Sequence, residues 1–137
     1  MGYTNSAHGN GGFDTLKQSG LEIVVKKKKF LKFKSDFNQK KITNNIVENI
    51  HKLLKEENIS YKIIEDLFDV VESDLKNEIK FNSKKDLLIY SYQVAGTVGL
   101  MMAKILKIKD QQSLKCAIDL GVAMQLTNIA RDVVEDK

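Results

Sequence analysis

Apolar residues recur at helical spacing through most of the chain after residue 42. The first stripe follows every third or fourth position and predicts a helix over residues 43–57; its members are Ile42, Ile46, Ile50, Leu53 and Leu54. Ser60 is suited to the N-cap of a second helix that ends near Lys80. The apolar stripe of that helix consists of Ile63, Ile64, Leu67, Val71, Leu75 and Ile79.

A third helix is predicted from the S-x-x-D signal of Ser83 and Asp86, which precedes an uncharged run from Leu87 through Ala103. The run is shorter than the about 20 residues of a membrane span and holds several polar side chains, so we expect a buried core helix. An α-helical wheel gives it a close-packing face of Gly96, Gly99 and Ala103. The opposite face carries Tyr90, Val94, Thr97 and Met101. A fourth helix begins near Asp110 or Ser113.

The first part of the chain has a different pattern. Residues 1–20 are rich in glycine, asparagine and serine, which predicts an irregular tail with little order. Residues 23–33 mix apolar residues with lysines and fit neither period, so strand, helix and linker all remain open. We therefore divide the chain into a basic, partly disordered N-terminal segment (1–41) and a helical domain (42–137).

Composition supports a single all-α domain. The 137 residues are 42% hydrophobic and include no proline, so nothing interrupts long helices. The single Cys116 cannot form an internal disulfide, and its apolar helical surroundings predict a buried free thiol in a reducing compartment. No secretory signal is present at the N-terminus, so we expect a cytoplasmic protein.

The net charge of +4 is concentrated in one basic block. Residues 26–41 contain one acidic residue, Asp36. Their lysines are Lys26, Lys27, Lys28, Lys29, Lys32, Lys34, Lys40 and Lys41. Such a block can attract nucleic acid or anionic lipid, although a solvated surface segment is the favoured interpretation. No aromatic interleaving or nucleic-acid motif accompanies it, so we expect no nucleic acid partner. Peripheral membrane contact remains an alternative, and residues 1–6 also match a short myristoylation pattern.

A polar stripe marks the last predicted helix. Gln125, Asn128, Asp132 and Asp136 fall within an arc of about 80° on an α-helical wheel. Carboxylate and amide oxygens are ligands that magnesium prefers, with water and phosphate oxygens completing the shell. The same face of the helix begins with Leu114, Ile118 and Gly121, so its side chains change along the helix from apolar to small to acidic. Such a face suits a ligand made of a hydrocarbon chain that ends in a diphosphate. The alternative is an ordinary amphipathic helix with a surface pair between Arg131 and Glu135.

Acidic groups gather at the end of this helix, where the helix dipole already places negative charge. Asp132, Glu135 and Asp136 should each be disfavoured there by a few tenths to about 1 kcal/mol. A bound cation or additional chain would relieve this. We expect the sequence to be a piece of a longer protein.

Two stretches, 90–99 (YSYQVAGTVG) and 120–136 (LGVAMQLTNIARDVVED), closely resemble the squalene/phytoene synthase family and occur in the family's order. The resemblance implies an all-α isoprenoid synthase fold. It also implies the head-to-head condensation of two geranylgeranyl diphosphates to phytoene, through a cyclopropyl intermediate and with magnesium, or manganese in its place.

The resemblance also assigns roles to residues. Asp132 and Asp136 match the family's second aspartate-rich motif, which binds metal bridged to diphosphate, and Tyr90 matches a cavity tyrosine that can stabilise an allylic cation. Arg131 lies in the motif, either beside the diphosphate or in a structural salt bridge. Positions along the hydrocarbon slot are matched by Val94, Val98, Gly121 and Met124, and positions at the diphosphate and metal site by Gln125 and Asn128, with Asn128 as a third metal ligand.

The chain departs from the family in what it omits. Nothing before Ile42 supplies the first aspartate-rich motif, and the helices that follow the second motif are missing. Two facing acidic clusters are needed to neutralise a departing diphosphate, so we expect the 137 residues alone to be inactive. Two alternatives stay open: a non-catalytic helical interaction module, and a squalene or dehydrosqualene synthase that uses farnesyl diphosphate.

Overall fold

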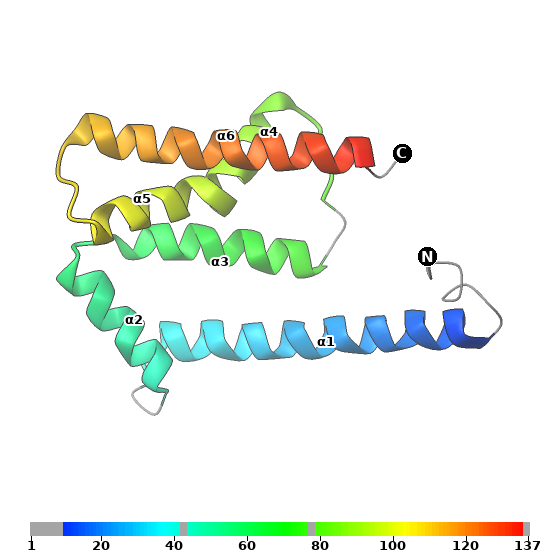
Figure 1. Cartoon of the computed structure of the whole chain (residues 1–137). Coiled ribbons are helices and arrows are strands. Elements are labelled where there is room, and N and C mark those ends of the chain that lie inside the picture. The colour runs from blue at the N-terminus through cyan, green and yellow to red at the C-terminus, as the bar shows by residue number, and fades with distance from the viewer. Residues whose placement is uncertain (1–9, 42–43, 77–78, 136–137) are drawn as a thin grey trace.

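The computed structural model describes residues 10–41, 44–76 and 79–135, and within these ranges it contains helices and no strand. In chain order they are α1 (Asn10–Asn38), α2 (Asn45–Glu56), α3 (Tyr61–Lys76), α4 (Lys84–Ser91), the π-helix η2 (Tyr92–Gly96), α5 (Thr97–Ile105) and α6 (Gln111–Glu135) (Figure 1). The predicted all-α class is confirmed. None of the described helices is both long enough and apolar enough to cross a bilayer.

Helix α1 corrects the prediction for the N-terminal segment. Residues 10–20 begin a regular helix rather than an irregular tail, and the open assignment of residues 23–33 resolves as helix. Residues 1–9 lie outside the described residues. The helix is held by Phe30, Phe33 and Phe37, whose spacing of three and four places their rings on one face. The scattered lysines hid this short stripe in the sequence.

The core forms where α1, α2 and α3 meet. The ring of Phe68 on α3 forms T-shaped contacts with the rings of Phe30, Phe33 and Phe37 at centroid distances of 5.8, 5.9 and 5.1 Å. Five further buried residues complete this core: Val47, Leu54, Ile59, Ile63 and Ile64. The aromatic cluster therefore fixes α1 on α3 near the C-terminal end of α1.

His51 connects the same three helices. Its ring stacks on Phe37 with the centroids 4.3 Å apart and the planes at 13°. Its Nε2 lies 2.9 Å from the Phe37 carbonyl oxygen, and its Nδ1 lies 2.8 Å from the Tyr61 hydroxyl. The neutral ring satisfies both contacts when Nε2–H donates to the carbonyl and Nδ1 accepts from Tyr61.

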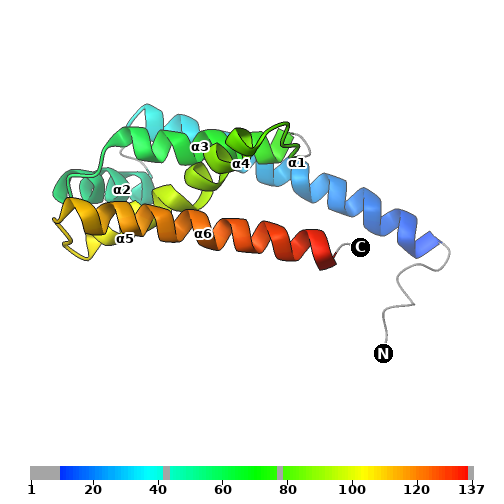
Figure 2. The same cartoon turned by 90° about the horizontal axis from the view of Figure 1, so that it is seen from above.

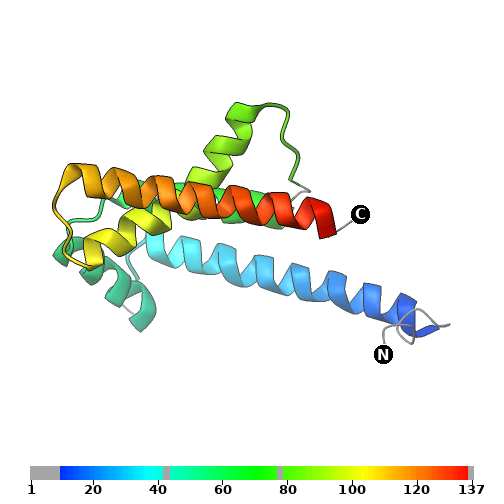
Figure 3. The same ribbon diagram turned by 45° about the horizontal axis from the view of Figure 1, so that its top comes forward.

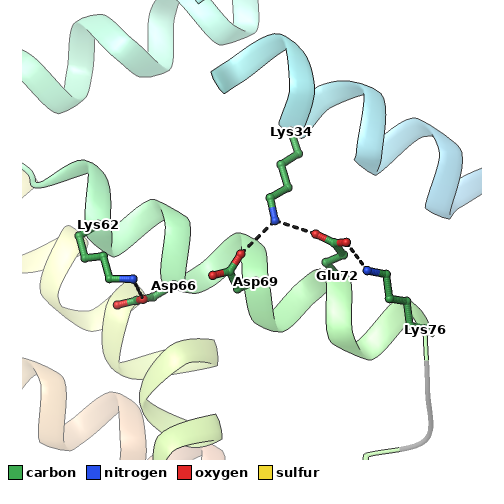
Figure 4. Close-up of polar contacts among 6 residues, drawn as sticks. All are labelled: Lys34, Lys62, Asp66, Asp69, Glu72 and Lys76. Carbon is green, nitrogen blue, oxygen red and sulfur yellow. Dashed lines mark hydrogen bonds and ion pairs between the residues drawn. The ribbon is translucent and has the colours of Figure 1, made fainter. Parts of the chain in front are cut away.

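An ion-pair network also joins α1 to α3 (Figure 4). The Lys34 ammonium lies 2.9 Å from Asp69 Oδ1 and 2.6 Å from Glu72 Oε2, and Lys76 pairs with Glu72 from the next turn. The hydrogen bond from Lys34, followed by that from Lys76, lowers the pKa of Glu72 to about 2. The bond to Glu72 likewise raises the pKa of Lys34 above its usual value.

The network predicts that acid loosens α1 from α3. Because the folded-state pKa of Glu72 is about 2 and its ordinary value is 4.5, its contribution to stability is complete above pH 4.5 and is lost as the pH falls towards 2. Chemical denaturation between pH 7 and 2 should show this loss, and a Glu72→Gln variant should lose less over the same window. Asp86→Asn, which removes an exposed acid of α4, is the matched control. Parallel losses in Glu72→Gln and in the unmodified chain would contradict the prediction.

Helices α2 and α3 follow the prediction closely, apart from one end. Asn44 caps α2, its side-chain oxygen accepting from the backbone N–H groups of Ile46 and Val47. Ser60 Oγ accepts from the N–H of Lys62 at 3.3 Å, as expected of the residue before α3. The prediction that α3 reaches Lys80 is wrong, because the helix ends at Lys76 and Ile79 is exposed outside it.

The third predicted helix forms as a continuous segment of α4, η2 and α5. Its start is confirmed, since Ser83 Oγ accepts the backbone N–H of Asp86 at 3.1 Å. The hydroxyls of Ser91 and Thr97 are fully buried and donate to the carbonyl oxygens of Leu87 and Gln93, each at 2.8 Å. The segment brings residues 94–103 against α6.

Candidate functional site

Glycines allow α6 to lie directly on η2 and α5. A Cβ added at Gly99 would stand 2.2 Å from the carbonyl oxygen of Ala117, and one at Gly121 would stand 2.3 Å from that of Ala95. At Gly96 the added atom would lie 3.3 Å from Ile118 Cγ2. The predicted close-packing role of Gly96 and Gly99 is therefore confirmed, and its partner is α6.

Beside this contact, η2, α5 and α6 line an apolar groove of about 470 Å³. The groove contains all the predicted hydrocarbon-slot and amide positions: Val94, Val98, Gly121, Met124, Gln125 and Asn128. Its other lining residues are Ala95, Gly99, Met102, Ala103, Leu106, Ile108, Ala117 and Leu120. With Leu120 63% and Met124 59% exposed, the groove is open to solvent.

The polarity of the groove changes along its length. Leu106 and Ile108 line it near the start of α6, whereas Gln125 and Asn128 are its polar side chains. Gln125 is half-buried and Asn128 is exposed. Asp132 lies one helical turn beyond Asn128, which places a carboxylate past the polar end of an apolar surface.

Asp132 is accompanied by the sole arginine of the chain. Arg131 Nη2 and Nε lie 3.1 and 3.3 Å from Asp132 Oδ1, and Arg131 Nε lies 3.9 Å from Glu135 Oε1. Both Arg131 and Asp132 side chains are more than half exposed, at 58% and 59%. Arg131 and Glu135 thus form the surface pair that was expected of an ordinary amphipathic helix. The Asp132 carboxylate still faces solvent. Asp136 lies outside the described residues.

Tyr90 is directed towards α3. Its hydroxyl donates to Asp74 Oδ2 at 3.2 Å, and the ring of Phe81 contacts its ring at a centroid distance of 5.2 Å. Burial raises the pKa of the Tyr90 phenol to about 12 and also raises that of the Asp74 carboxyl. Tyr90 is therefore a neutral phenol near pH 7.

The structure separates Tyr90 from Val94, which the α-helical wheel had placed on one face. Val94 lines the groove against α6, whereas the Tyr90 hydroxyl meets Asp74 on α3. The π-helical turn Tyr92–Gly96 changes the rotation per residue between them, because its bonds span five residues instead of four. Sequence reasoning assumed an uninterrupted α-helical rotation here and missed this turn.

Cys116 corrects another prediction. Its side chain is exposed rather than buried, although it stands in a helix between buried Leu114 and half-buried Ala117. Position 116 falls on the face of α6 turned away from η2 and α5. The apolar residues next to Cys116 in the sequence did not reveal on which face of α6 its thiol lies.

The oxygen donors at the polar end fit a hard divalent cation by their chemistry. Gln125, Asn128 and Asp132 offer amide and carboxylate oxygens, which magnesium and manganese accept. Within residues 10–41, 44–76 and 79–135, no three His, Cys, Asp or Glu side chains gather into a metal cluster.

Comparison with known proteins agrees with the two motifs. The family model for squalene/phytoene synthase matches residues 14–137, which include every described helix except the first residues of α1. The chain therefore belongs to the squalene/phytoene synthase family.

Individual relatives match shorter stretches. A 15-cis-phytoene synthase of Enterobacter agglomerans is 55% identical over 60 residues, covering 44% of this chain and 20% of that protein. A 4,4'-diapophytoene synthase of Staphylococcus haemolyticus is 42% identical over 79 residues, covering 57% and 27%. The chloroplastic phytoene synthase 1 of Zea mays is 40% identical over 77 residues, covering 52% and 18%. The matched part thus spans about a fifth to a quarter of these relatives, and no solved structure matches the chain.

Proposed function

We propose that the protein to which this chain belongs is a head-to-head prenyltransferase that condenses two geranylgeranyl diphosphates to phytoene in carotenoid biosynthesis. The observation that carries the proposal is the apolar groove whose polar end is formed by Gln125 and Asn128, with Asp132 one turn beyond. A prenyl diphosphate has the same order of chemistry, a hydrocarbon chain followed by two phosphates.

In this proposal each part of the groove has a distinct task. Val94, Val98, Gly121 and Met124 contact the prenyl chain, and burying that chain against them is favourable because it removes apolar surface from water. Gln125, Asn128, Asp132 and Asp136 hold the diphosphate end together with magnesium, which would neutralise the charge of the leaving group. Arg131 can donate to phosphate oxygens through its planar fork.

Tyr90 has a supporting task in the same proposal. Burial, followed by the charge of Asp74, raises the pKa of its phenol to about 12 and keeps it neutral, and the hydrogen bond to Asp74 orients the hydroxyl. The resemblance gives Tyr90 the stabilisation of a developing allylic cation. Tyr90 does not line the groove and its hydroxyl meets Asp74 on α3, so we propose this role on the α3 side of the helix.

The prenyl chain length defines the main alternative. The Staphylococcus haemolyticus relative is a 4,4'-diapophytoene synthase, whereas the Enterobacter agglomerans relative is a 15-cis-phytoene synthase. A squalene- or dehydrosqualene-type synthase acting on farnesyl diphosphate would use the same groove with a shorter chain. A non-catalytic helical interaction module is the alternative from another class, and the exposure of Leu120 and Met124 favours it.

Calorimetric titration with unreactive thiodiphosphate analogues of the two substrates tests the proposal. With magnesium present, we expect the geranylgeranyl analogue to bind, and Val98→Asp to weaken its binding about tenfold or more because a carboxylate then faces the chain. Val24→Asp, an equivalent change on exposed α1, should leave binding unchanged.

The alternatives give different results in the same titration. Tighter binding of the farnesyl analogue would replace phytoene synthesis by the shorter-chain reaction. Thermal unfolding of the chain gives a second test. A cooperative transition whose midpoint temperature stays the same when magnesium and either analogue are added would favour the interaction module.

A further inference from the structure

The N-terminal part of α1 takes no part in the helical core. The core side chains of α1 are Phe30, Phe33 and Phe37. From Gln18 to Lys29 every side chain is exposed, apart from half-buried Lys27. Figures 2 and 3 show these turns running past the end of α3. We call residues 18–32, apart from the core residue Phe30, the α1 arm.

Aliphatic side chains lie on the arm without a packing partner. Leu21 is 61% exposed, and Ile23, Val24 and Val25 are each about half exposed. On a helical wheel Leu21, Val24, Val25 and Leu31 share an arc of about 120°, and its centre is nearly opposite the phenylalanine stripe. Because that stripe holds α1 on α3, the aliphatic face is directed away from the bundle.

Lysines accompany this face. Lys28 and Lys32 share its arc, Lys27 and Lys29 flank it, and Glu22 is the acid of the arm. Of the lysines from 26 to 34, Lys34 alone forms an ion pair with a described residue. The arm therefore combines unburied aliphatic groups with a concentrated positive charge.

We propose that the α1 arm docks on an anionic lipid surface. A helix lying in the headgroup layer can direct Leu21, Val24 and Val25 towards the acyl chains while its lysines bind phosphates, because lysine stems extend along apolar surface and keep the ammonium in water. A nucleic acid would use the lysines alone and leave the aliphatic groups in water. The outward face also lacks the aromatic side chains on which bases stack.

Co-sedimentation with vesicles tests the docking. We expect the chain to bind vesicles containing about one third phosphatidylserine at least tenfold better than pure phosphatidylcholine, and added salt to release it. Lys28→Gln with Lys29→Gln should reduce binding several-fold. Val24→Ser with Val25→Ser should also reduce it, although the charge is unchanged.

Matched pairs elsewhere on the chain control both changes. Lys84→Gln with Lys85→Gln removes the same charge from the start of α4, and Val133→Ser with Val134→Ser removes two exposed valines from α6. Both control pairs should bind like the unmodified chain. Equal binding to the two vesicle types, equal losses in test and control pairs, or full binding by the Val24 and Val25 pair would each overturn the proposal. Binding to single-stranded RNA without vesicle binding would overturn it as well.

Discussion

Replacing Gly99 with alanine should lower the free energy of unfolding by about 1–3 kcal/mol, the usual cost of forcing an extra group into a packed core. The added Cβ would stand 2.2 Å from the Ala117 carbonyl oxygen, which is backbone and cannot rotate away. Helix α6 would have to move off α5, which would also disturb the groove between them. Urea denaturation measures the stability change, and binding of the geranylgeranyl analogue reports the groove.

Gly20 offers the matched control. It also lies within a helix, but an added Cβ meets nothing within 4 Å. Gly20→Ala should leave stability unchanged or raise it by up to about 1 kcal/mol, because alanine is the better helix former. If Gly99→Ala were as stable as Gly20→Ala, the close contact of α5 with α6 would be refuted.

These glycines show what the sequence could predict about the fold. A glycine in a helix interior is disfavoured unless packing requires it, so Gly96 and Gly99 indicate a contact face from the sequence itself. Helical periodicity located α2, α3 and α6 for the same reason, since each must bury one stripe. The partner of each face was not predictable, because periodicity carries no information on which helices meet.

The N-terminal segment shows the limit of this reasoning. The apolar stripe has only three members, Phe30, Phe33 and Phe37, and the lysines between them mask its helical period. Contacts with Phe68 and the ion pairs of Lys34, whose partners are distant in sequence, hold the C-terminal part of the helix on α3. The local pattern left the segment ambiguous, and tertiary contacts fix only the part of it that reaches the core.

The candidate site divides in a similar way. The family motifs were sufficient to group Val94, Val98 and Met124, which line one groove, whereas the α-helical wheel had placed Val94 opposite Gly99. Tyr90 was not predictable in the same way, because the π-helical turn breaks the angular rule that linked it to Val94. Its partner is Asp74 of α3, whose carboxylate accepts the hydrogen bond of the Tyr90 hydroxyl.

The charges at the end of α6 support two different roles for Asp132. As part of a surface pair with Arg131, its removal would cost about 1 kcal/mol or less of stability and nothing else. As a ligand for magnesium and diphosphate, its removal would leave stability nearly unchanged and impair binding. The two roles therefore separate in a single variant.

We expect Asp132→Asn to weaken magnesium-dependent binding of the geranylgeranyl analogue. Loss of a metal's outer-shell partner costs roughly 10- to 100-fold in affinity, and loss of a direct ligand should cost at least as much. Asn keeps the size of the side chain and removes the charge that attracts the cation. Asp119→Asn is the matched control, since Asp119 is an exposed acid of the same helix about 140° away on the wheel. Equal affinities of the two variants, measured by calorimetry with and without magnesium, would assign Asp132 to the surface pair alone.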